Sequence, residues 1–165
     1  MKTIYIAGGC FWGVEEYYRQ LKGVISTRVG YANGDKINPS YEEVKHHLVS
    51  HAETLKLEYD ESVISLEKIL EHFLRFVDPY SEDKQGEDRG HQYRSGVYYI
   101  DPQEEKIIRN YFDNHLSQNY KIEVLPLQNF YEAEEYHQNY LIKNPTGYCH
   151  INMRLIKNEE KKLMH

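Results

Sequence analysis

The sequence predicts an α+β protein, a two-layer sandwich with helices against a mixed or antiparallel sheet and an irregular C-terminal segment. Apolar residues alternate in several short stretches and recur every three or four residues in others, as in strands and helices respectively. The central elements follow the order strand, helix, strand, strand, helix, strand. That order is typical of the ferredoxin-like fold. A doubly wound parallel sheet is disfavoured, because no long crossover helix separates the second and third strands.

Turn residues separate the expected elements of the N-terminal half. The pair Gly8-Gly9 separates a strand from a helix, the pair Asn33-Gly34 closes the next strand, and Pro39 precedes a short helix. Alternation through Leu55 and Leu57 indicates the third strand. The elements expected here are a strand over 2–7, a helix over 10–21, a strand over 24–31, a helix over 41–47 and a strand over 52–59.

The C-terminal half contains two helices with clear signals. In the first, apolar residues from Leu66 to Val77 share one helical face and Pro79 ends it, while Asp101 and Pro102 mark the start of the second. The elements expected here are a helix over 66–77, a strand over 93–100, a helix over 102–116, a strand over 120–127, a helix over 133–142 and an irregular charged tail after about residue 152.

Composition narrows the possible classes of protein. A chain of 165 residues with 40% hydrophobic residues is expected to form one domain, spanning 1–165, without disulfides or metals. The net charge of −6 gives no attraction for nucleic acid. No apolar run is long enough to cross a membrane and no export signal is recognisable, so we expect the protein in the reducing cytoplasm. We also expect it to be a monomer. A structural disulfide between the two cysteines does not persist there.

Cys10 stands where the first strand ends and a helix begins, in Gly-Gly-Cys-Phe-Trp-Gly. Free N–H groups and the helix dipole favour an anion at that position, so we expect the pKa of this thiol to lie below its usual value. A thiolate there would be a nucleophile. Phe11 and Trp12, the only tryptophan, would line an apolar pocket beside it. The alternative is that Cys10 is a small buried apolar residue.

Glu53 lies at the start of the third strand, with the parity of the apolar Leu55 and Leu57. Facing an apolar pocket, it would keep its proton to higher pH and could act as a general acid. An exposed residue at a frayed strand end is the competing interpretation. Asp88 and Tyr93 belong to a polar stretch that suits a binding loop, although ordinary solvated loops look similar.

The remaining candidates are a second thiol and a group of histidines. Cys149 follows a turn-rich stretch and could condense with a sulfenic acid on another cysteine, or could be an unrelated surface residue. His46, His47 and His51 cluster, but the sequence contains neither a His-Glu-x-x-His helix nor a Cys-x-x-Cys pair, so we expect no metal.

An ordered set of short motifs resembles the type A peptide methionine sulfoxide reductases over about residues 3–152. The matching segments are Gly8-Gly9-Cys10-Phe11-Trp12-Gly13, Val29-Gly30-Tyr31 with Gly34, Pro39 to Val44, His51-Ala52-Glu53, Asp88 with Gly90 and Gln92 to Ser95, Ala133-Glu134 with Tyr136 to Gln138, and Asn144-Pro145 with Gly147-Tyr148-Cys149. The resemblance implies reduction of the S epimer of methionine sulfoxide, free or in oxidised proteins, with no cofactor and with thioredoxin or dithiothreitol as reductant.

The resemblance also implies roles for individual residues. Cys10 is expected to attack the sulfoxide sulfur, Glu53 to protonate its oxygen and Cys149 to resolve the resulting sulfenic acid. The substrate-binding residues would be Phe11 and Trp12 around the methyl group, Tyr41 and Tyr93 at the oxygen, and Asp88 in ordering the site. Weaker candidates are His137, Tyr140 and Tyr148.

Three features depart from the commonest pattern of that family. Glu87 and His91 replace residues that are usually Asn and Thr or Ser, and the tail lacks a third cysteine, which excludes a second resolving pair. His150 and the charged tail have no assigned role. Two other classes of function remain open: a cysteine redox sensor without turnover, and a tyrosine-rich binding module.

Overall fold

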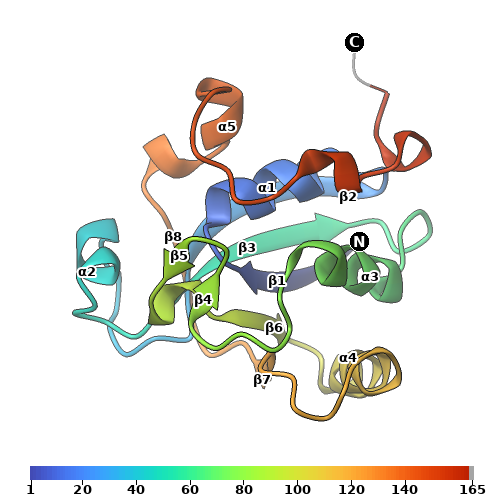
Figure 1. Cartoon of the computed structure of the whole chain (residues 1–165), viewed down its shortest axis with the longest axis horizontal. Helices are drawn as coiled ribbons and strands as arrows, with labels where there is room; N and C mark the ends of the chain where they lie inside the picture. Colours follow the sequence, from blue (N-terminus) through green and yellow to red (C-terminus); the bar gives the residue numbers. More distant parts are fainter. Residues whose placement is uncertain (164–165) are drawn as a thin grey trace.

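The computed structural model describes residues 1–163 and is built around a six-stranded mixed sheet with the order β7-β6-β1-β3-β2-β8 (Figure 1). β3 lies between β1 and β2 and is antiparallel to both, which is the split β-α-β arrangement of the ferredoxin-like fold. β7 adds to β6 in parallel. The strands are β1 (Lys2–Gly8), β2 (Val24–Ala32), β3 (Ala52–Tyr59), β6 (Ser95–Tyr99), β7 (Glu123–Pro126) and β8 (Phe130–Glu132).

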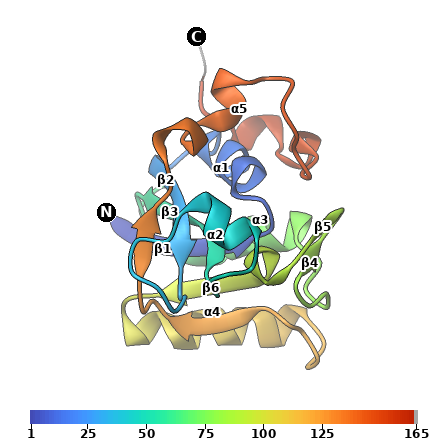
Figure 2. The same ribbon diagram turned by 90° about the vertical axis from the view of Figure 1, so that its left-hand side faces the viewer.

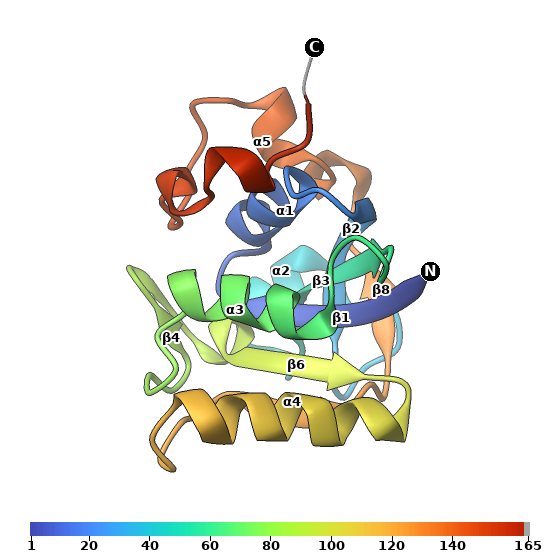
Figure 3. The same cartoon turned by 90° about the vertical axis from the view of Figure 1, so that its right-hand side faces the viewer.

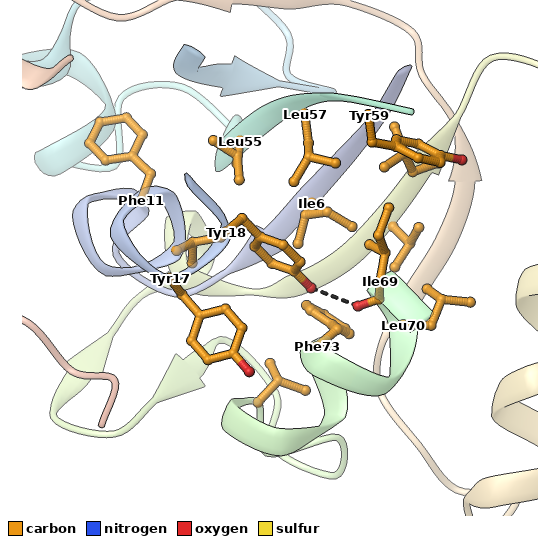
Figure 4. Close-up of a cluster of buried hydrophobic side chains, with 14 of the residues drawn as sticks. Ile6, Phe11, Tyr17, Tyr18, Leu55, Leu57, Tyr59, Ile69, Leu70 and Phe73 are labelled. Carbon is orange, nitrogen blue, oxygen red and sulfur yellow. Dashed lines mark hydrogen bonds between the residues drawn. The ribbon is translucent and has the colours of Figure 1, made fainter. Parts of the chain in front are cut away.

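Helices cover one face of the sheet, and Figure 4 shows the core between them. The helices are α1 (Phe11–Arg19), α2 (Tyr41–Lys45), α3 (Leu66–Phe76), α4 (Pro102–His115) and α5 (Tyr140–Lys143). Apolar side chains of α1 and α3 pack on β1 and β3, and the Tyr18 hydroxyl donates to the Ile69 carbonyl at 2.8 Å. On the opposite face, Leu127 and Phe130 pack against a small cluster that contains Tyr5 and Tyr98.

The expected α+β sandwich is confirmed, but three local predictions are wrong. The expected helix over 133–142 is instead a 3₁₀ turn at Glu135–His137 followed by α5. The Gln138 side chain bonds to the backbone N–H and C=O of Val29, which holds this segment along β2 and out of a helix. Tyr93 lies in the 3₁₀ turn His91–Tyr93 rather than in β6, and residues 120–122 precede β7.

A two-stranded hairpin, β4 (Lys84–Gln85) and β5 (Asp88–Arg89), forms within the polar stretch. Figure 2 shows this hairpin to the right of α2, with α1 above α2. The hairpin therefore lies at the same end of the sheet as the connection between β1 and α1.

The tail after residue 152 is irregular but docked. Figure 3 shows it beside α1, and the Lys22 N–H donates to the Glu160 carbonyl at 2.9 Å. The Glu160 carboxylate accepts two hydrogen bonds from Arg75 of α3, at 2.7 and 2.8 Å. Ile151 and Ile156 are buried against the body of the protein. Within residues 1–163, no helix is long and apolar enough to span a bilayer.

Candidate active site

Cys10 lies between the last residues of β1 and the first turn of α1, and its side chain is only 7% exposed. The preceding Gly9 has a φ of +92°, and a Cβ there would lie 2.8 Å from Nε2 of His150. Glycine thus satisfies both the backbone conformation and the close packing before the thiol.

The expectation of a lowered pKa for Cys10 is wrong. Burial raises the pKa of this thiol well above its usual value, and the nearby Glu53 raises it further. The Trp12 backbone N–H at the helix start acts in the opposite direction but is a smaller effect. The cost of desolvating a thiolate therefore exceeds the benefit of the helix terminus.

Glu53 in β3 is buried, with 1% of its surface exposed, which rules out the frayed-end interpretation. Its Oε1 accepts a hydrogen bond from the Phe11 N–H at 3.2 Å, so β3 is tied to the start of α1. Oε2 is also buried and has no hydrogen-bond partner among residues 1–163. Burial raises the pKa of Glu53 to about 8, so the carboxyl group is mainly protonated at neutral pH.

Aromatic rings surround the start of α1. The ring centroids of Phe11 and His137 lie 5.3 Å apart. Trp12 stacks on Tyr140, with ring centroids 3.7 Å apart and ring planes within 8° of parallel. The indole N–H of Trp12 donates to Nδ1 of His137 at 2.9 Å. Tyr41 at the start of α2 contacts His137 with centroids 4.5 Å apart. Burial, with smaller contributions from Glu53 and Cys10, raises the pKa of Tyr41 to about 12, so it is a proton donor at neutral pH.

The hairpin and its following turn bring further polar groups to the same site. Burial first, and then the proximity of Glu53 and Cys10, raise the pKa of Tyr93 far above its ordinary value. Tyr148 donates a hydrogen bond from its hydroxyl to Oδ2 of Asp88 at 2.9 Å. Burial first, and then Asp88, raise the pKa of Tyr148 above its ordinary value, with a smaller contribution from Cys10. Asp88 also makes a small contribution to the raised pKa of Cys10.

Cys149 is half-buried and is not in a disulfide. Its thiol donates to the Ile151 carbonyl at 3.4 Å, and a Cβ at Gly13 of α1 would lie 3.2 Å from Sγ. It is near enough to Cys10 to contribute to the raised pKa of that thiol. On its outer side, Cys149 lines a shallow cavity of about 240 Å³ together with Glu16, Leu141, Pro145, Gly147, Ile151 and Met153.

Sequence reasoning missed the polar residues that hold the aromatic groups in place. Glu134 accepts hydrogen bonds from the Tyr31 hydroxyl at 2.9 Å and from the Tyr41 N–H at 3.1 Å. It thereby fixes the start of α2 beside β2. The segments containing Glu134 and Gln138 match the family motifs, but sequence alone gave these two side chains no function. The one sequence feature that could have indicated their role is the high density of polar residues in the segment 133–142, which was expected to be a helix packed on the sheet.

The structure thus brings together all the predicted site residues at one end of the sheet, around Cys10 and Glu53. Within residues 1–163 it brings no three His, Cys, Asp or Glu side chains together as a metal would require, and His46 and His47 are exposed. A buried thiol next to a protonated buried carboxylic acid, with a second free thiol nearby, defines the class: a thiol-dependent oxidoreductase.

Comparisons with known proteins identify the family within that class. The family model described as peptide methionine sulfoxide reductase matches residues 2–165, and the chain belongs to this family. A peptide methionine sulfoxide reductase MsrA from Ureaplasma urealyticum is 51% identical over 160 residues, which cover 95% of this chain and 97% of the relative.

Solved structures agree with this assignment. The structure of Mxr1 from Saccharomyces cerevisiae in reduced form has a TM-score of 0.84 at 36% identity, covering 90% of this chain and 88% of the other. Mxr1 in complex with Trx2 has a TM-score of 0.59 at 28% identity, with 84% of each chain covered. The protein is an oxidoreductase that reduces methionine sulfoxide.

Proposed function

We propose that Cys10 and Glu53 together reduce the S epimer of methionine sulfoxide, free or within oxidised proteins. The observation that carries this proposal is the state of the Glu53 carboxyl group. Its Oε1 is held by the Phe11 N–H, while its buried Oε2 is unpartnered among the described residues, and the carboxyl group is close enough to Cys10 to raise the pKa of that thiol. A protonated, buried carboxyl group beside the nucleophile is suited to donate a proton to a sulfoxide oxygen.

The chemistry balances without an external reactant. Cys10 Sγ attacks the sulfoxide sulfur and forms an S–S bond, while the oxygen on that sulfur becomes a hydroxyl group. The hydroxyl group then passes to the Cys10 sulfur, so that the S–O bond and the new S–S bond both break, and methionine leaves a sulfenic acid on Cys10. The substrate sulfur gains two electrons and the Cys10 sulfur loses two. Glu53 donates a proton to the oxygen, and the proton of the Cys10 thiol replaces it. Positive charge on the protonated sulfoxide favours the thiolate, which offsets the raised pKa of Cys10.

The surrounding residues orient the substrate in this proposal. Phe11 and Trp12 bind the methyl group, and the hydroxyl groups of Tyr41 and Tyr93 donate to the oxygen. Asp88 orders the site through its hydrogen bond with Tyr148. The weaker candidates act on the aromatic wall: His137 fixes the Trp12 indole and Tyr140 stacks on it.

Cys149 resolves the sulfenic acid as a disulfide with Cys10, and a dithiol then restores both thiols. Its position over Gly13, half-exposed, supports this role. The relative Mxr1 forms a complex with Trx2, so we propose a thioredoxin as reductant, with dithiothreitol as a substitute. We further propose that the chain acts as a single-domain monomer in the reducing cytoplasm.

Separate S and R epimers of a methionine sulfoxide substrate, incubated with the protein and dithiothreitol, test the proposal. Methionine should form from the S epimer only. Equal turnover of both epimers would contradict the stereospecific site. Absence of turnover would support a redox sensor, and binding without reduction would support a binding module.

A further inference from the structure

His150 follows Cys149 and packs its ring against the loop that precedes Cys10. Its Nε2 lies 2.9 Å from the Gly8 carbonyl oxygen. A carbonyl oxygen only accepts hydrogen bonds, so Nε2 must carry the hydrogen. In the neutral imidazole, Nδ1 is then left with a free lone pair.

This Nδ1 atom has no task in the fold. It is buried and has no hydrogen-bond partner among residues 1–163. It faces Gly13 of α1 beside the Cys149 thiol: one methyl group at Gly13 would lie 3.1 Å from Nδ1 and 3.2 Å from Sγ of Cys149. A buried acceptor without a donor is costly, so a role in the chemistry of the neighbouring thiol is a physical reason for its presence.

We propose that Nδ1 of His150 is the base that removes the proton from Cys149 as this thiol attacks the sulfenic acid on Cys10. The inference rests on the proposed function and assigns the second step a catalytic residue. Rotation of the Cys149 side chain away from the Ile151 carbonyl turns its S–H toward Nδ1. The Cys149 sulfur then bonds to the Cys10 sulfur, the S–O bond of the sulfenic acid breaks, and the departing hydroxide takes the proton from Nδ1 to form water.

The charges around both groups are consistent with this transfer. Burial lowers the pKa of His150, opposed by smaller effects of the hydrogen bond to the Gly8 carbonyl and of Asp88 in β5, so the imidazole is a neutral base at pH 7. Burial, assisted by Glu16 of α1, raises the pKa of Cys149, so that thiol does not ionise by itself. The rival base would be Glu16, but its carboxylate already accepts two hydrogen bonds from Arg19, both at 2.5 Å. Cys10 is the sulfenic acid at this stage, and the Tyr148 hydroxyl donates its hydrogen to Asp88.

A His150→Gln variant separates the base from the structural hydrogen bond. The glutamine amide can still donate to the Gly8 carbonyl but has no basic nitrogen. Reduced protein is mixed with one equivalent of methionine S-sulfoxide without reductant, and samples are quenched and analysed for methionine and for the Cys10–Cys149 disulfide by mass spectrometry. At pH 7 the variant should form methionine at the parent rate but form the disulfide slower by on the order of a hundredfold.

The pH dependence distinguishes a base from a merely structural role. When the accumulated sulfenic acid of the variant is taken by a pH jump to about pH 10, a larger fraction of Cys149 ionises unaided and the deficit should shrink. The parent should show a disulfide rate that changes little between pH 7 and pH 9. The matched control Glu16→Gln should form the disulfide at the parent rate.

Three results for the disulfide step would overturn the inference. These are a parent-like disulfide rate in His150→Gln at pH 7, a deficit that is the same at every pH, and an equal deficit in Glu16→Gln. Loss of methionine formation in His150→Gln alone would also overturn it, because His150 would then act on the Cys10 loop. Loss of methionine formation in the parent would instead contradict the proposed function.

Discussion

The two cysteines occupy regions that are built in different ways. Cys10 precedes the first turn of α1, and Glu53 lies in β3. The Phe11 N–H of α1 donates a hydrogen bond to Glu53, and both Cys10 and Glu53 are buried. Cys149 lies in a segment of turns between α5 and the 3₁₀ turn at Met153–Leu155, and its side chain makes one weak hydrogen bond. One thiol is fixed, and the other is half-exposed on irregular chain.

The difference matches the demands of two chemical steps. Oxygen transfer requires the nucleophile, the acid and the substrate in one geometry with water excluded, which a rigid site provides. Resolution requires a thiol that reaches the buried sulfur and afterwards presents the disulfide to a bulky reductant. Irregular backbone with few contacts provides that freedom.

Removal of either thiol is expected to have the largest effect and tests most directly whether the two cysteines have separate roles. Cys10→Ser should abolish methionine formation, because hydroxyl oxygen is a far poorer nucleophile than sulfur. Cys149→Ser should produce one methionine per protein molecule and then fail to cycle with thioredoxin. Methionine measured under single-turnover and multiple-turnover conditions checks both, and continued thioredoxin-dependent cycling of Cys149→Ser would contradict the division of roles.

Glu53→Gln is expected to have the next largest effect. The amide still accepts the Phe11 N–H but donates no acidic proton, so the first turnover should slow by about 10²–10⁴-fold. In the parent, the same step should fall as pH rises through about 8, where Glu53 ionises. A parent-like rate in Glu53→Gln, measured by rapid quench, would show that another group supplies the proton.

The same substitution should stabilise the fold. The pKa of Glu53 is higher in the folded protein than in the unfolded chain, so the stability associated with its neutral form is fully present below about pH 4.5 and is lost as pH rises to about 8. Glutamine has no such loss and should raise the free energy of unfolding by on the order of 4 kcal/mol at pH 8. Urea unfolding at pH 5 and pH 8 checks this, with little difference expected at pH 5.

Glu160→Gln should have the smallest effect and tests how the C-terminal tail is anchored on α3. Loss of charge weakens the two hydrogen bonds from Arg75, so we expect the free energy of unfolding to fall by about 1 kcal/mol. The first turnover should stay at the parent rate, since the Cys10 site is untouched. Glu135→Gln, which alters the exposed pair with Arg28, is the matched control and should leave the unfolding midpoint unchanged.

The parts of the fold that sequence predicted are those in which local pattern and tertiary packing agree. The apolar stripe of α3 and the alternation of β3 both face the core that their periods imply. The prediction of a helix over 133–142 was wrong because the Gln138 side chain bonds to the backbone N–H and C=O of Val29. No local sequence pattern reveals that contact. The identities of Cys10 and Glu53 were accessible from motif and parity, but the burial that sets their protonation was not.

The pKa of Cys10 illustrates the same limit. The helix start is a local feature, and its N–H groups could be predicted from sequence. The pKa of Cys10 is set mainly by burial of the thiol and by Glu53, which is 43 positions away in the chain. Charge balance in a buried site is therefore a property of the assembled fold.

Trp12 determines where the tryptophan fluorescence of the protein originates. It is the only tryptophan in the chain, it stacks on Tyr140, and its N–H is bonded to His137. Indole emission depends on the polarity and the contacts of the ring, so all of the tryptophan fluorescence of this protein originates at the wall beside Cys10. Occupancy of that site and rearrangement of its surroundings thus have a built-in optical signal, free of background from elsewhere in the molecule.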